Sequence, residues 1–428
     1  MTPAARLQMA IEILEGLGAT QQPLDRFLKQ WFRSRRFAGS ADRRAIGETV
    51  FAIQRSRARL AHRMGCESAR ALVVALAAEQ GGDMTALFSG GYGPAPLSEA
   101  ERAALARTPD ALPDWVRGEY PPWLEDELKR AFGERLMAEM AAMQARAPVD
   151  LRVNTLKASR PDVLAALKAD GFAVEPTPWS PVGIRIPREH RAGAERRSPG
   201  DQNKFEGSAA LAKSALFAGG AFEFQDEAAQ IASLLAGARP GMAVLDLAAG
   251  AGGKALAMAA AMQDRGRILA FDDRPERLAP LAERAARAGA DVIAMAARRD
   301  GWDKDLFDLV FLDAPCSGTG TWRRQPELRW RLTPERLADL TRIQDRLLDE
   351  AARHTRPGGM ILYATCSVLP VENQDRIAAF LARQPRFVRV NLMENWQAVP
   401  PPGLAGDFRA SPARTGTDGF FAAGLGRS

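Results

Sequence analysis

The hydrophobic positions in the first 75 residues recur at the spacing of amphipathic helices. The clearest examples are RLQMAIEILEGL, LDRFLKQWF and SADRRAIGETVFAIQRSRARL. Apolar side chains that recur every three or four residues lie on one face of a helix. This pattern predicts a helical domain over residues 1–75. Residues 76–145 hold Ala-rich helical patches separated by the turn signals GGYGPAP and YPPW, which predicts a helical connector.

The pattern changes near residue 146. The segment DLRVNTLK is typical of a strand, RPDVLAALKADG of a helix that Gly171 ends, and FAVEPTPWSPVGIRIP of irregular strands. Together these segments predict a small α+β module over residues 146–222.

From residue 223 onward, strand patterns alternate with helix patterns. The predicted strands are MAVLDLAA, GRILAFDD, DVIAMAA, FDLVFLDAP and GGMILYATCS, and RFVRVNLM and DGFFAAGLG are expected to add a closing pair of edge strands. Such alternation predicts an α/β domain over residues 223–428, in which helices cover both faces of a parallel sheet. Ligands of such sheets bind outside the carboxyl ends of the strands.

Composition narrows the class of protein. The chain has 428 residues, 46% of them hydrophobic, which fits two or three globular domains. It has no run of 18 uncharged apolar residues and no signal-peptide layout at its start, so we expect a cytoplasmic protein without a membrane segment. Cys66, Cys316 and Cys366 form no CxxC pair and only three histidines are present, so neither a disulfide framework nor a metal site is predicted. We expect a monomer, and no obligate protein partner is predicted from the sequence.

The positive charge is concentrated near the N-terminus. The whole chain carries +6, while residues 1–70 hold 13 Lys and Arg against 6 Asp and Glu. The excess has two readings that the sequence leaves open. It is either a solvated helical face or a surface that binds the phosphates of a nucleic acid.

A Gly-rich turn follows the first predicted strand of the α/β domain. In VLDLAAGAGGK, Gly250, Gly252 and Gly253 allow a tight turn and the close approach of a ligand. The second strand, ILAFDD, ends with an acidic residue about 20 positions later, where a carboxylate meets a ribose diol. Asp300 follows the third strand and is placed to contact an adenine edge. The glycine spacing differs from the G-x-G-x-x-G of nicotinamide sites. Acids at successive strand ends suit S-adenosylmethionine, which carries no pyrophosphate to repel them, so the pattern favours this cofactor over a plain strand-to-helix turn.

Two cysteine motifs make the interpretation specific. LDAPCSGTGTWRRQPELRW and LYATCSVLPVENQ resemble the two cysteine motifs of RNA cytosine-C5 methyltransferases of the RsmB (Sun, Fmu) type. FEFQDEAAQ is similar to the entry into the catalytic domain of that family, LRVNTLK to its RNA-recognition-like module, and DRRAIGETVFAIQR to its NusB-like domain.

The resemblance implies a fold for each part of the chain. It implies a Rossmann-like methyltransferase domain with a seven-stranded mixed sheet, a small α+β RNA-recognition-like module before it, and an N-terminal helical NusB-like domain that binds RNA. It also implies S-adenosyl-L-methionine as cofactor and an RNA substrate. The first turn departs from the family pattern because Ala-Ala-Gly-Ala-Gly-Gly-Lys-Ala lacks the usual proline. We expect cofactor binding to persist with a more flexible turn.

The resemblance also implies roles for single residues. Cys366 is the nucleophile, Cys316 is the second thiol needed for product release, and Asp313 binds the target base beside the cofactor. The residues implied to surround the cofactor are Ala248, Ala249, Gly250, Ala251, Gly252, Gly253, Lys254, Asp272, Asp300 and Asp313.

The chemistry explains why two thiols are needed. Carbon 5 of cytosine is a poor nucleophile, but addition of a thiolate to C6 makes C5 enamine-like, so that it can attack a methyl sulfonium. A second acid/base group near the adduct then helps the C5 proton and the thiolate to leave. Asp313 is placed to hold the N3 and N4 edge of the base, and the sequence leaves its protonation state open.

A stacked base cannot reach such a pocket, so the target must be looped or flipped out. Cations interleaved with Trp322 and Trp330 are expected to contact the RNA. These cations are Arg323, Arg324, Arg329 and Arg331, with Lys254 from the Gly-rich turn. Two other readings remain: the arginines form a solvated helix edge around core tryptophans, and Lys254 closes a salt bridge inside the site.

Several functions remain open. The NusB-like extension favours small-subunit ribosomal RNA of the 16S type as substrate, with transfer RNA as the alternative. In a DNA cytosine-C5 methyltransferase, Cys316 would be the nucleophile instead. A non-catalytic RNA-binding assembly factor with a degraded cofactor turn is the remaining alternative.

Overall fold

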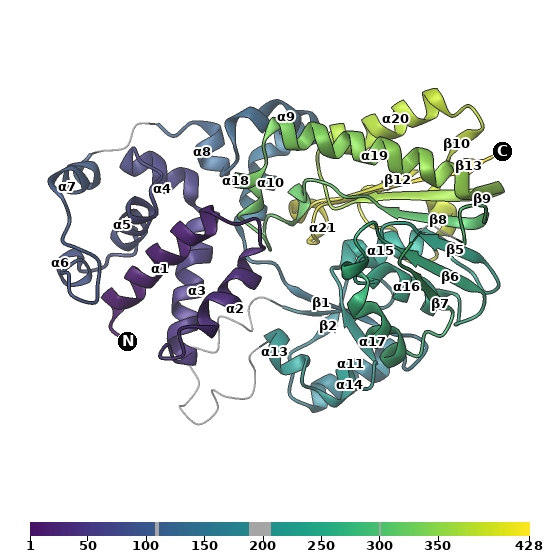
Figure 1. Ribbon diagram of the computed structural model, residues 1–428, viewed down its shortest axis with the longest axis horizontal. Helices are drawn as coiled ribbons and strands as arrows, with labels where there is room; N and C mark the ends of the chain where they lie inside the picture. The colour runs from purple at the N-terminus through teal and green to yellow at the C-terminus, as the bar shows by residue number, and fades with distance from the viewer. Residues whose placement is uncertain (108–110, 188–206, 299–300) are drawn as a thin grey trace. The chain divides into compact units, whose positions relative to one another are not determined.

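The N-terminal helices predicted from the hydrophobic pattern pack around one apolar core. This is seen in a computed structural model that describes residues 1–107, 111–187, 207–298 and 301–428 (Figure 1). The helices that supply most of this core are α1 (Pro3–Gly18), α2 (Leu24–Arg33), α3 (Ser40–Arg55), α4 (Arg57–Met64) and α5 (Ala69–Glu79). Of the described helices, none is long and apolar enough to cross a membrane.

The segment predicted as a connector belongs to the same unit as these helices. Its helices are α6 (Met84–Leu87), α7 (Glu99–Ala106), α8 (Asp114–Gly118), α9 (Glu125–Phe132) and α10 (Leu136–Gln144), with short 3₁₀ turns η1 (Pro122–Leu124) and η2 (Gly133–Arg135). Ala104 of α7 is buried in the core that α1 to α5 form. Clustering of contacts assigns Met1–Ala145 to one unit and Arg146–Thr321 with Thr333–Ser428 to another.

A distant segment completes the helical unit. Trp322–Leu332, which contains the short helix α18 (Leu328–Arg331), clusters with Met1–Ala145 rather than with its sequence neighbours. Arg329 is fully buried and donates to the carbonyl oxygen of Glu119 at 2.9 Å. The carboxylate of Glu327 accepts from the backbone N–H of Leu24 at 2.9 Å. A buried guanidinium with backbone partners fixes the segment in place, because a loss of these partners would leave an unpaired charge.

The small α+β module folds as an antiparallel sheet with one main helix. Its strands, in the order β2-β3-β1-β4, are β1 (Val149–Val153), β2 (Glu175–Pro176), β3 (Gly183–Ile186) and β4 (Phe222–Phe224). Helix α11 (Arg160–Ala169) packs Val163 and Leu167 into the module's core. Helices α13 (Gly207–Leu211) and α14 (Ala215–Ala218) precede β4.

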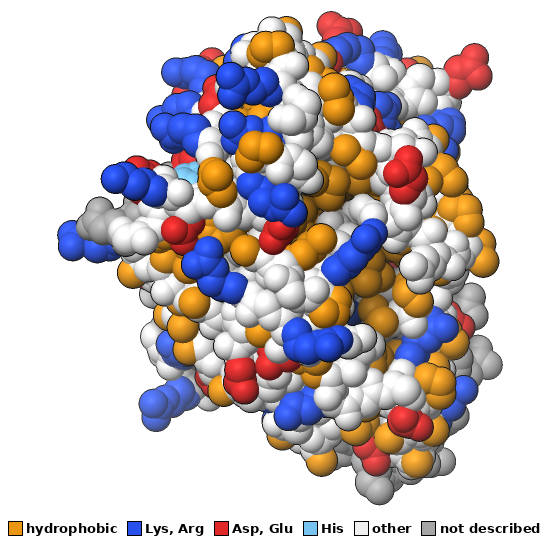
Figure 2. Space-filling model, turned by 90° about the vertical axis from the view of Figure 1, so that its right-hand side faces the viewer, with side chains coloured by type: hydrophobic (Ala, Val, Ile, Leu, Met, Phe, Trp, Pro, Cys, Tyr) orange, Lys and Arg blue, Asp and Glu red, His pale blue; other side chains and the backbone are white. Residues whose placement is uncertain are grey.

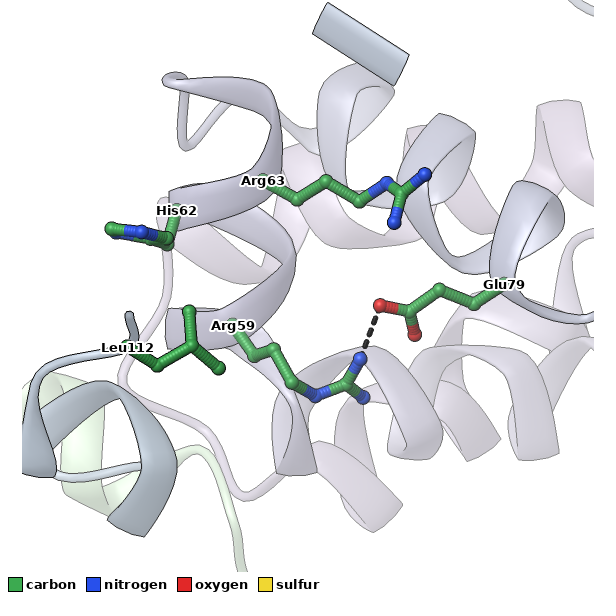
Figure 3. A pocket seen from close by; sticks show the side chains of 5 residues that line it. All are labelled: Arg59, His62, Arg63, Glu79 and Leu112. Carbon is green, nitrogen blue, oxygen red and sulfur yellow. Dashed lines mark hydrogen bonds and ion pairs between the residues drawn. The ribbon is translucent and has the colours of Figure 1, made fainter. Parts of the chain in front are cut away.

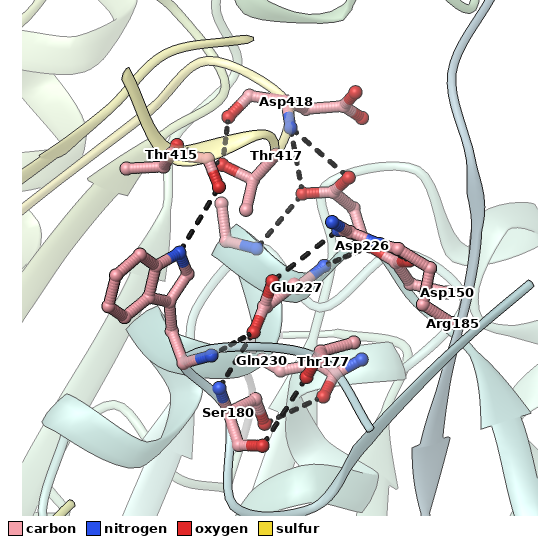
Figure 4. Close-up of polar contacts among 12 residues, drawn as sticks. Asp150, Thr177, Ser180, Arg185, Asp226, Glu227, Gln230, Thr415, Thr417 and Asp418 are labelled. Atoms are coloured by element: carbon pink, nitrogen blue, oxygen red, sulfur yellow. Dashed lines mark hydrogen bonds and ion pairs between the residues drawn. The ribbon is translucent and has the colours of Figure 1, made fainter. Parts of the chain in front are cut away.

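A buried polar network ties this module to the catalytic part of its unit (Figure 4). Arg185 on β3 makes two hydrogen bonds of 2.7 Å to Asp150 on β1 and an ion pair of 3.4 Å to Glu227. Glu227 also accepts from the backbone N–H groups of Trp179 and Ser180 at 2.7 and 2.8 Å. One guanidinium therefore faces two carboxylates, and the backbone N–H groups that donate to Glu227 offset the remaining negative charge.

The large sheet contains nine strands among the described residues, against the seven predicted. Its path is β11-β12-β13-β9-β8-β5-β6-β7, and β10 pairs with β13. The five parallel strands are β5 (Ala243–Asp246), β6 (Arg267–Phe271), β7 (Ile293–Ala296), β8 (Phe307–Asp313) and β9 (Thr355–Thr365). The antiparallel strands are β10 (Phe387–Val390), β11 (Leu404–Ala405), β12 (Asp407–Ala410) and β13 (Phe420–Arg427).

The position of β13 corrects one expectation. It was predicted at the sheet edge, but it lies between β9 and β12. Its Phe421, Ala422 and Ala423 are at most 1% exposed, which fits an inner strand. The antiparallel turn from β11 to β12 extends the sheet beyond it, and two-residue strands of this kind give too short a hydrophobic pattern to be read from sequence.

Helices cover both faces of the sheet, as predicted. Successive residues of β5 point to opposite faces, so that Val244 joins one apolar core and Leu245 the other. The first core includes residues of α15 (Glu227–Leu235), α16 (Gly253–Ala261) and α17 (Ala279–Ala288). The second includes residues of α19 (Pro334–His354) and α20 (Gln374–Arg383). The carboxyl ends of the parallel strands therefore open between two helical layers, where a ligand binds in this class of fold.

Candidate active site

The two cysteine motifs meet at the carboxyl ends of β8 and β9. These strands pair in parallel, and Asp313 lies opposite Ala364 in the register. Cys316 follows β8 and Cys366 follows β9, and their sulfur atoms are 3.4 Å apart. The structure thus brings together two thiols that 50 residues of sequence separate.

The two thiols differ in their surroundings. The hydrogen bond with Cys366, together with burial and the negative charge of Glu372, raises the pKa of Cys316 well above its ordinary value. Cys316 therefore keeps its proton near neutral pH. Either sulfur atom can donate in the contact between the two thiols.

Close backbone packing fixes the loop after Cys316. The N–H of Gly320 donates to the carbonyl oxygen of Cys366 at 2.9 Å, and the N–H of Gly419 donates to the carbonyl oxygen of Gly320 at 2.8 Å. A Cβ atom on Gly320 would lie 2.0 Å from the carbonyl oxygen of Gly419. Only glycine fits there without moving backbone.

Lys254 and Asp313 form an ion pair beside the thiols, which is the salt bridge considered for Lys254 from the sequence. Burial opposes the positive charge of Lys254, but Asp313, Cys366 and Asp246 outweigh it and raise the pKa of Lys254. The ion pair indicates that Asp313 is a carboxylate in this structure. Such a carboxylate accepts hydrogen bonds, which suits the amino group of a cytosine better than its N3 atom.

Asp246, the last residue of β5, is a polar group that the sequence analysis missed. It is fully buried, and neither carboxylate oxygen has a hydrogen-bond partner within the described parts of the chain. Burial and repulsion by Asp313 raise its pKa to about 7, and Lys254 opposes this shift. The position of Asp246 at the end of a strand, just before a Gly-rich turn, is the signal in the sequence that could have identified this residue.

The Gly-rich turn has the geometry of a ligand cradle. Gly250 and Gly252 have φ of +53° and +77°, which favours glycine at both positions. The carboxylate of Asp272 accepts from the N–H of Gly250 at 3.0 Å and pairs with Arg277 at 3.3 Å. The predicted cofactor residues Ala248, Ala249, Ala251 and Gly253 lie in this turn or at the start of α16, while Asp300 lies outside the described residues.

These groups fit S-adenosylmethionine. The free oxygens of Asp246 can accept from its ammonium group, and the buried carboxylate of Asp272 stands at the strand end where a ribose is held. The described residues contain no group of three or more His, Cys, Asp or Glu that could hold a metal ion.

The arginines predicted to contact RNA are mostly internal. Arg323 is 1% exposed and Arg329 is fully buried, so neither guanidinium is available to a solvent-borne RNA here. Arg331 donates to the carbonyl oxygen of Gln22 at 2.8 Å. The alternating Arg and Trp pattern therefore reflects internal anchoring in the helical unit, while Arg324 is half-buried and stays a prediction.

A separate pocket lies in the helical unit (Figure 3). It has a volume of about 210 Å³ and is lined by Arg59, His62, Arg63, Glu79 and Leu112. Arg59 is ion-paired with Glu79 across the pocket. None of the predicted catalytic residues lines this pocket. The positive charge of Arg59 is already paired with Glu79.

Comparison with known proteins agrees with the geometry. Residues 233–426 match the family model described as 16S rRNA methyltransferase RsmB/F, and residues 120–192 match the ferredoxin-like domain model of RsmF/B-like methyltransferases. The match confirms the predicted methyltransferase domain, its Rossmann-like class and S-adenosylmethionine as the cofactor of that class.

Individual relatives support the same family. The chain is 34% identical over 329 residues to ribosomal RNA small subunit methyltransferase B of Sodalis glossinidius, covering 76% of this chain and 70% of the relative. It is 36% identical over 272 residues to the protein of that name from Pseudomonas syringae pv. tomato, covering 63% of this chain and 56% of the relative. A solved methyltransferase homologue from Pyrococcus horikoshii superposes with a TM-score of 0.60 at 26% identity, covering 74% of this chain and 98% of the other. The chain belongs to the RsmB/F family of 16S rRNA methyltransferases.

Proposed function

We propose that this protein methylates carbon 5 of a cytosine in small-subunit ribosomal RNA, through a covalent adduct between Cys366 and carbon 6. The observation that carries the proposal is the pair of sulfur atoms 3.4 Å apart, one of them held protonated, beside the ion pair of Lys254 and Asp313. The names of the relatives support the choice of ribosomal RNA.

The first step uses Cys366, Lys254 and Asp313. The thiolate of Cys366 forms a bond to C6, and the electron pair of the C5–C6 double bond moves toward N3 and O2. The ammonium of Lys254 stabilises the negative charge that develops there, because preorganised charges in a partly buried site cost no rearrangement. The carboxylate of Asp313 accepts from the amino group at C4 and orients the base. When bound, S-adenosylmethionine supplies the electrophilic methyl group that C5 attacks.

The last step uses Cys316. The bond between Cys366 and C6 breaks as the C5 proton leaves, and the C5–C6 double bond forms again. The S–H of Cys316 gives its proton to the departing sulfur of Cys366, and the Cys316 thiolate takes up the C5 proton. Cys366 then releases one proton to water before the next cycle. This balance yields 5-methylcytosine and one proton for each methyl group transferred.

A suicide substrate tests the covalent step. RNA that carries 5-fluorocytosine should form a complex with the wild-type protein and S-adenosylmethionine that survives denaturing electrophoresis, because fluorine cannot leave C5 as the proton does. Bisulfite sequencing of RNA from cells with and without the protein then names the substrate. A protected cytosine in transfer RNA alone would reject the ribosomal substrate, and no adduct with any RNA would reject the enzyme.

The helical unit offers a surface for the RNA. Residues 26–44 hold seven Lys and Arg against one acid, Asp42, which is already paired with Arg6 at 2.8 Å. In the loop between α2 and α3, Phe37 is 71% exposed and is flanked by Arg36. Figure 2 looks at the molecule from the right-hand side of Figure 1, away from the labels of α2 and α3, and Lys and Arg side chains are prominent on that face as well. An exposed aromatic ring among cations suits a stacked base and its phosphates.

Replacement of Phe37 with alanine is expected to weaken binding of a single-stranded RNA by about tenfold, since one stacked base contributes about 1–3 kcal/mol. Phe37→Trp should keep the affinity, and Arg36→Ala should lower the salt dependence of binding by about one phosphate. Fluorescence anisotropy with an RNA that lacks cytosine measures binding without catalysis. Tyr92→Ala is the matched control, because Tyr92 is 93% exposed in a loop without cations. An equal loss in both alanine variants would remove the loop from the interface.

A further inference from the structure

Two consecutive buried residues connect the loops that carry the thiols. Glu372 ends the 3₁₀ turn η6 (Pro370–Glu372), and Asn373 follows it. Glu372 is fully buried and Asn373 is 4% exposed. Neither residue reaches the substrate in the mechanism above, so their burial so close to the site needs another explanation.

Glu372 holds the loop of Cys316. Its carboxylate accepts from the backbone N–H of Ser317 at 2.8 Å and also from the hydroxyl of Ser317. The amide of Gln344 on α19 donates to the same carboxylate at 3.1 Å and to the carbonyl oxygen of Pro315 at 2.9 Å. Ser317 is thus bonded directly to the carboxylate of Glu372, and Pro315 is linked to the same carboxylate through Gln344. Burial raises the pKa of Glu372, and the hydrogen bonds from Ser317 and Gln344 oppose this shift without cancelling it.

Asn373 holds the strand end of Cys366. Its side-chain oxygen accepts from the hydroxyl of Thr365 at 2.6 Å, and its side-chain nitrogen donates to the carbonyl oxygen of Ser367 at 2.9 Å. The residues that flank Cys366 are therefore held by one amide. The hydroxyls of Thr319 and Ser367 meet at 3.0 Å and link the two loops directly.

We propose that Glu372 and Asn373 are positioning residues that set the separation of the two thiols, Glu372 by holding the loop of Cys316 and Asn373 by holding the strand end of Cys366. The role of the two residues in catalysis rests on the proposed covalent mechanism. The test of their effect on the thiols does not depend on that mechanism. Glu372 acts on Cys316 through charge and geometry, whereas Asn373 acts on Cys366 through geometry alone.

The charged and titratable groups around Cys316 allow this effect. Cys366 and Glu372 act on it directly, and Tyr363 of β9 interacts with both Glu372 and Cys316. The phenol of Tyr363 also donates to the backbone carbonyl of Glu372 at 2.6 Å. Lys254 interacts with Cys366 and is ion-paired with Asp313. Glu372 is the carboxylate among the groups that act on Cys316, so neutralising it changes the charge there specifically.

Alkylation of the thiols by iodoacetamide, measured in short pulses between pH 7 and 11.5 so that the range extends toward the raised midpoint of Cys316, tests the proposal without RNA or cofactor. Trypsin places Cys316 in residues 305–323 and Cys366 in residues 354–376, so mass spectrometry follows each thiol separately. In Glu372→Gln, the midpoint for Cys316 should move down by about one pH unit, because a nearby like charge has been removed. In Asn373→Ala, the rate for Cys366 should change at every pH, while the midpoint for Cys316 stays in place.

Two controls separate charge from folding. Glu372→Asp keeps the charge and should keep the midpoint of Cys316 even if the loop loosens. Asp349→Asn removes a carboxylate that is 43% exposed on α19 and should change neither thiol. A similar rise in the alkylation of both thiols in Glu372→Gln, without a midpoint shift, would show a merely structural role and overturn the proposal. Failure of the wild-type protein to trap 5-fluorocytosine RNA would instead reject the covalent mechanism and leave this test intact.

Discussion

Cys366→Ala is expected to abolish both methylation and the adduct with 5-fluorocytosine RNA, with a loss of about 10⁴-fold or more in kcat, as is usual when a nucleophile is removed. Cys316→Ala should have a different effect. Cys366 can still attack in that variant, but no thiol 3.4 Å away is left to return the proton. The protein should then accumulate as a covalent complex with unmodified RNA that contains the target cytosine.

The two variants are compared by denaturing electrophoresis of mixtures with ordinary RNA and with 5-fluorocytosine RNA. Cys66→Ala is the control, because Cys66 is an exposed thiol in the helical unit and should leave both results unchanged. An adduct that persists in Cys366→Ala but disappears in Cys316→Ala would reverse the roles. That result would match the chemistry of DNA cytosine-C5 methyltransferases, in which the Pro-Cys thiol attacks.

Lys254→Met is expected to lower kcat/KM by about 10²–10³-fold, which is typical for the loss of one preorganised electrostatic group. The substitution removes the cation that attracts the carboxylates of both Asp313 and Asp246, which repel each other. The pKa of Asp246, already raised to about 7, should rise further because Lys254 no longer opposes the shift. Asp246 then ionises at a higher pH, so the acidic limb of the pH–rate profile should move upward.

Calorimetric titration with S-adenosylmethionine near pH 9 separates two roles of Lys254, since Asp246 is ionised there in either protein. The sequence placed this residue at both the cofactor and the substrate. If its main role is toward the base and Cys366, the cofactor affinity of Lys254→Met changes little while adduct formation slows. Lys168→Met, on the exposed face of α11, serves as the control. Loss of cofactor binding with normal adduct formation would assign Lys254 to the cofactor instead.

Much of the catalytic part could be predicted because its signals are local. The strand that runs into Asp313 and Cys316 and the strand that ends before Cys366 are long and apolar, and parallel neighbours bring their ends together. Glycines with positive φ mark the turn before α16 equally clearly. These site residues lie in short continuous motifs, so the sequence alone identifies them.

The remaining parts depend on contacts between distant residues. Arg323 and Arg329 have the composition of an RNA-binding segment, and only tertiary packing shows that they are internal. Asp246 looks like an ordinary strand-end acid until its missing partners are seen. Glu372 lies 55 residues from Ser317, and no periodicity predicts their hydrogen bond. Charge patterns alone do not separate a buried anchor from a binding surface.

The helical unit is discontinuous in the chain, and this affects the order in which it can be completed. Trp322 and Arg329 are fully buried side chains of a segment that clusters with Met1–Ala145. Because synthesis proceeds from the N-terminus, this unit waits for residue 332 to leave the ribosome before its last segment can pack. By then the small module and most of the parallel strands have already emerged. The first domain to be made is therefore completed only after residue 332 has emerged, and until then the apolar positions that Trp322 covers have no partner from this segment.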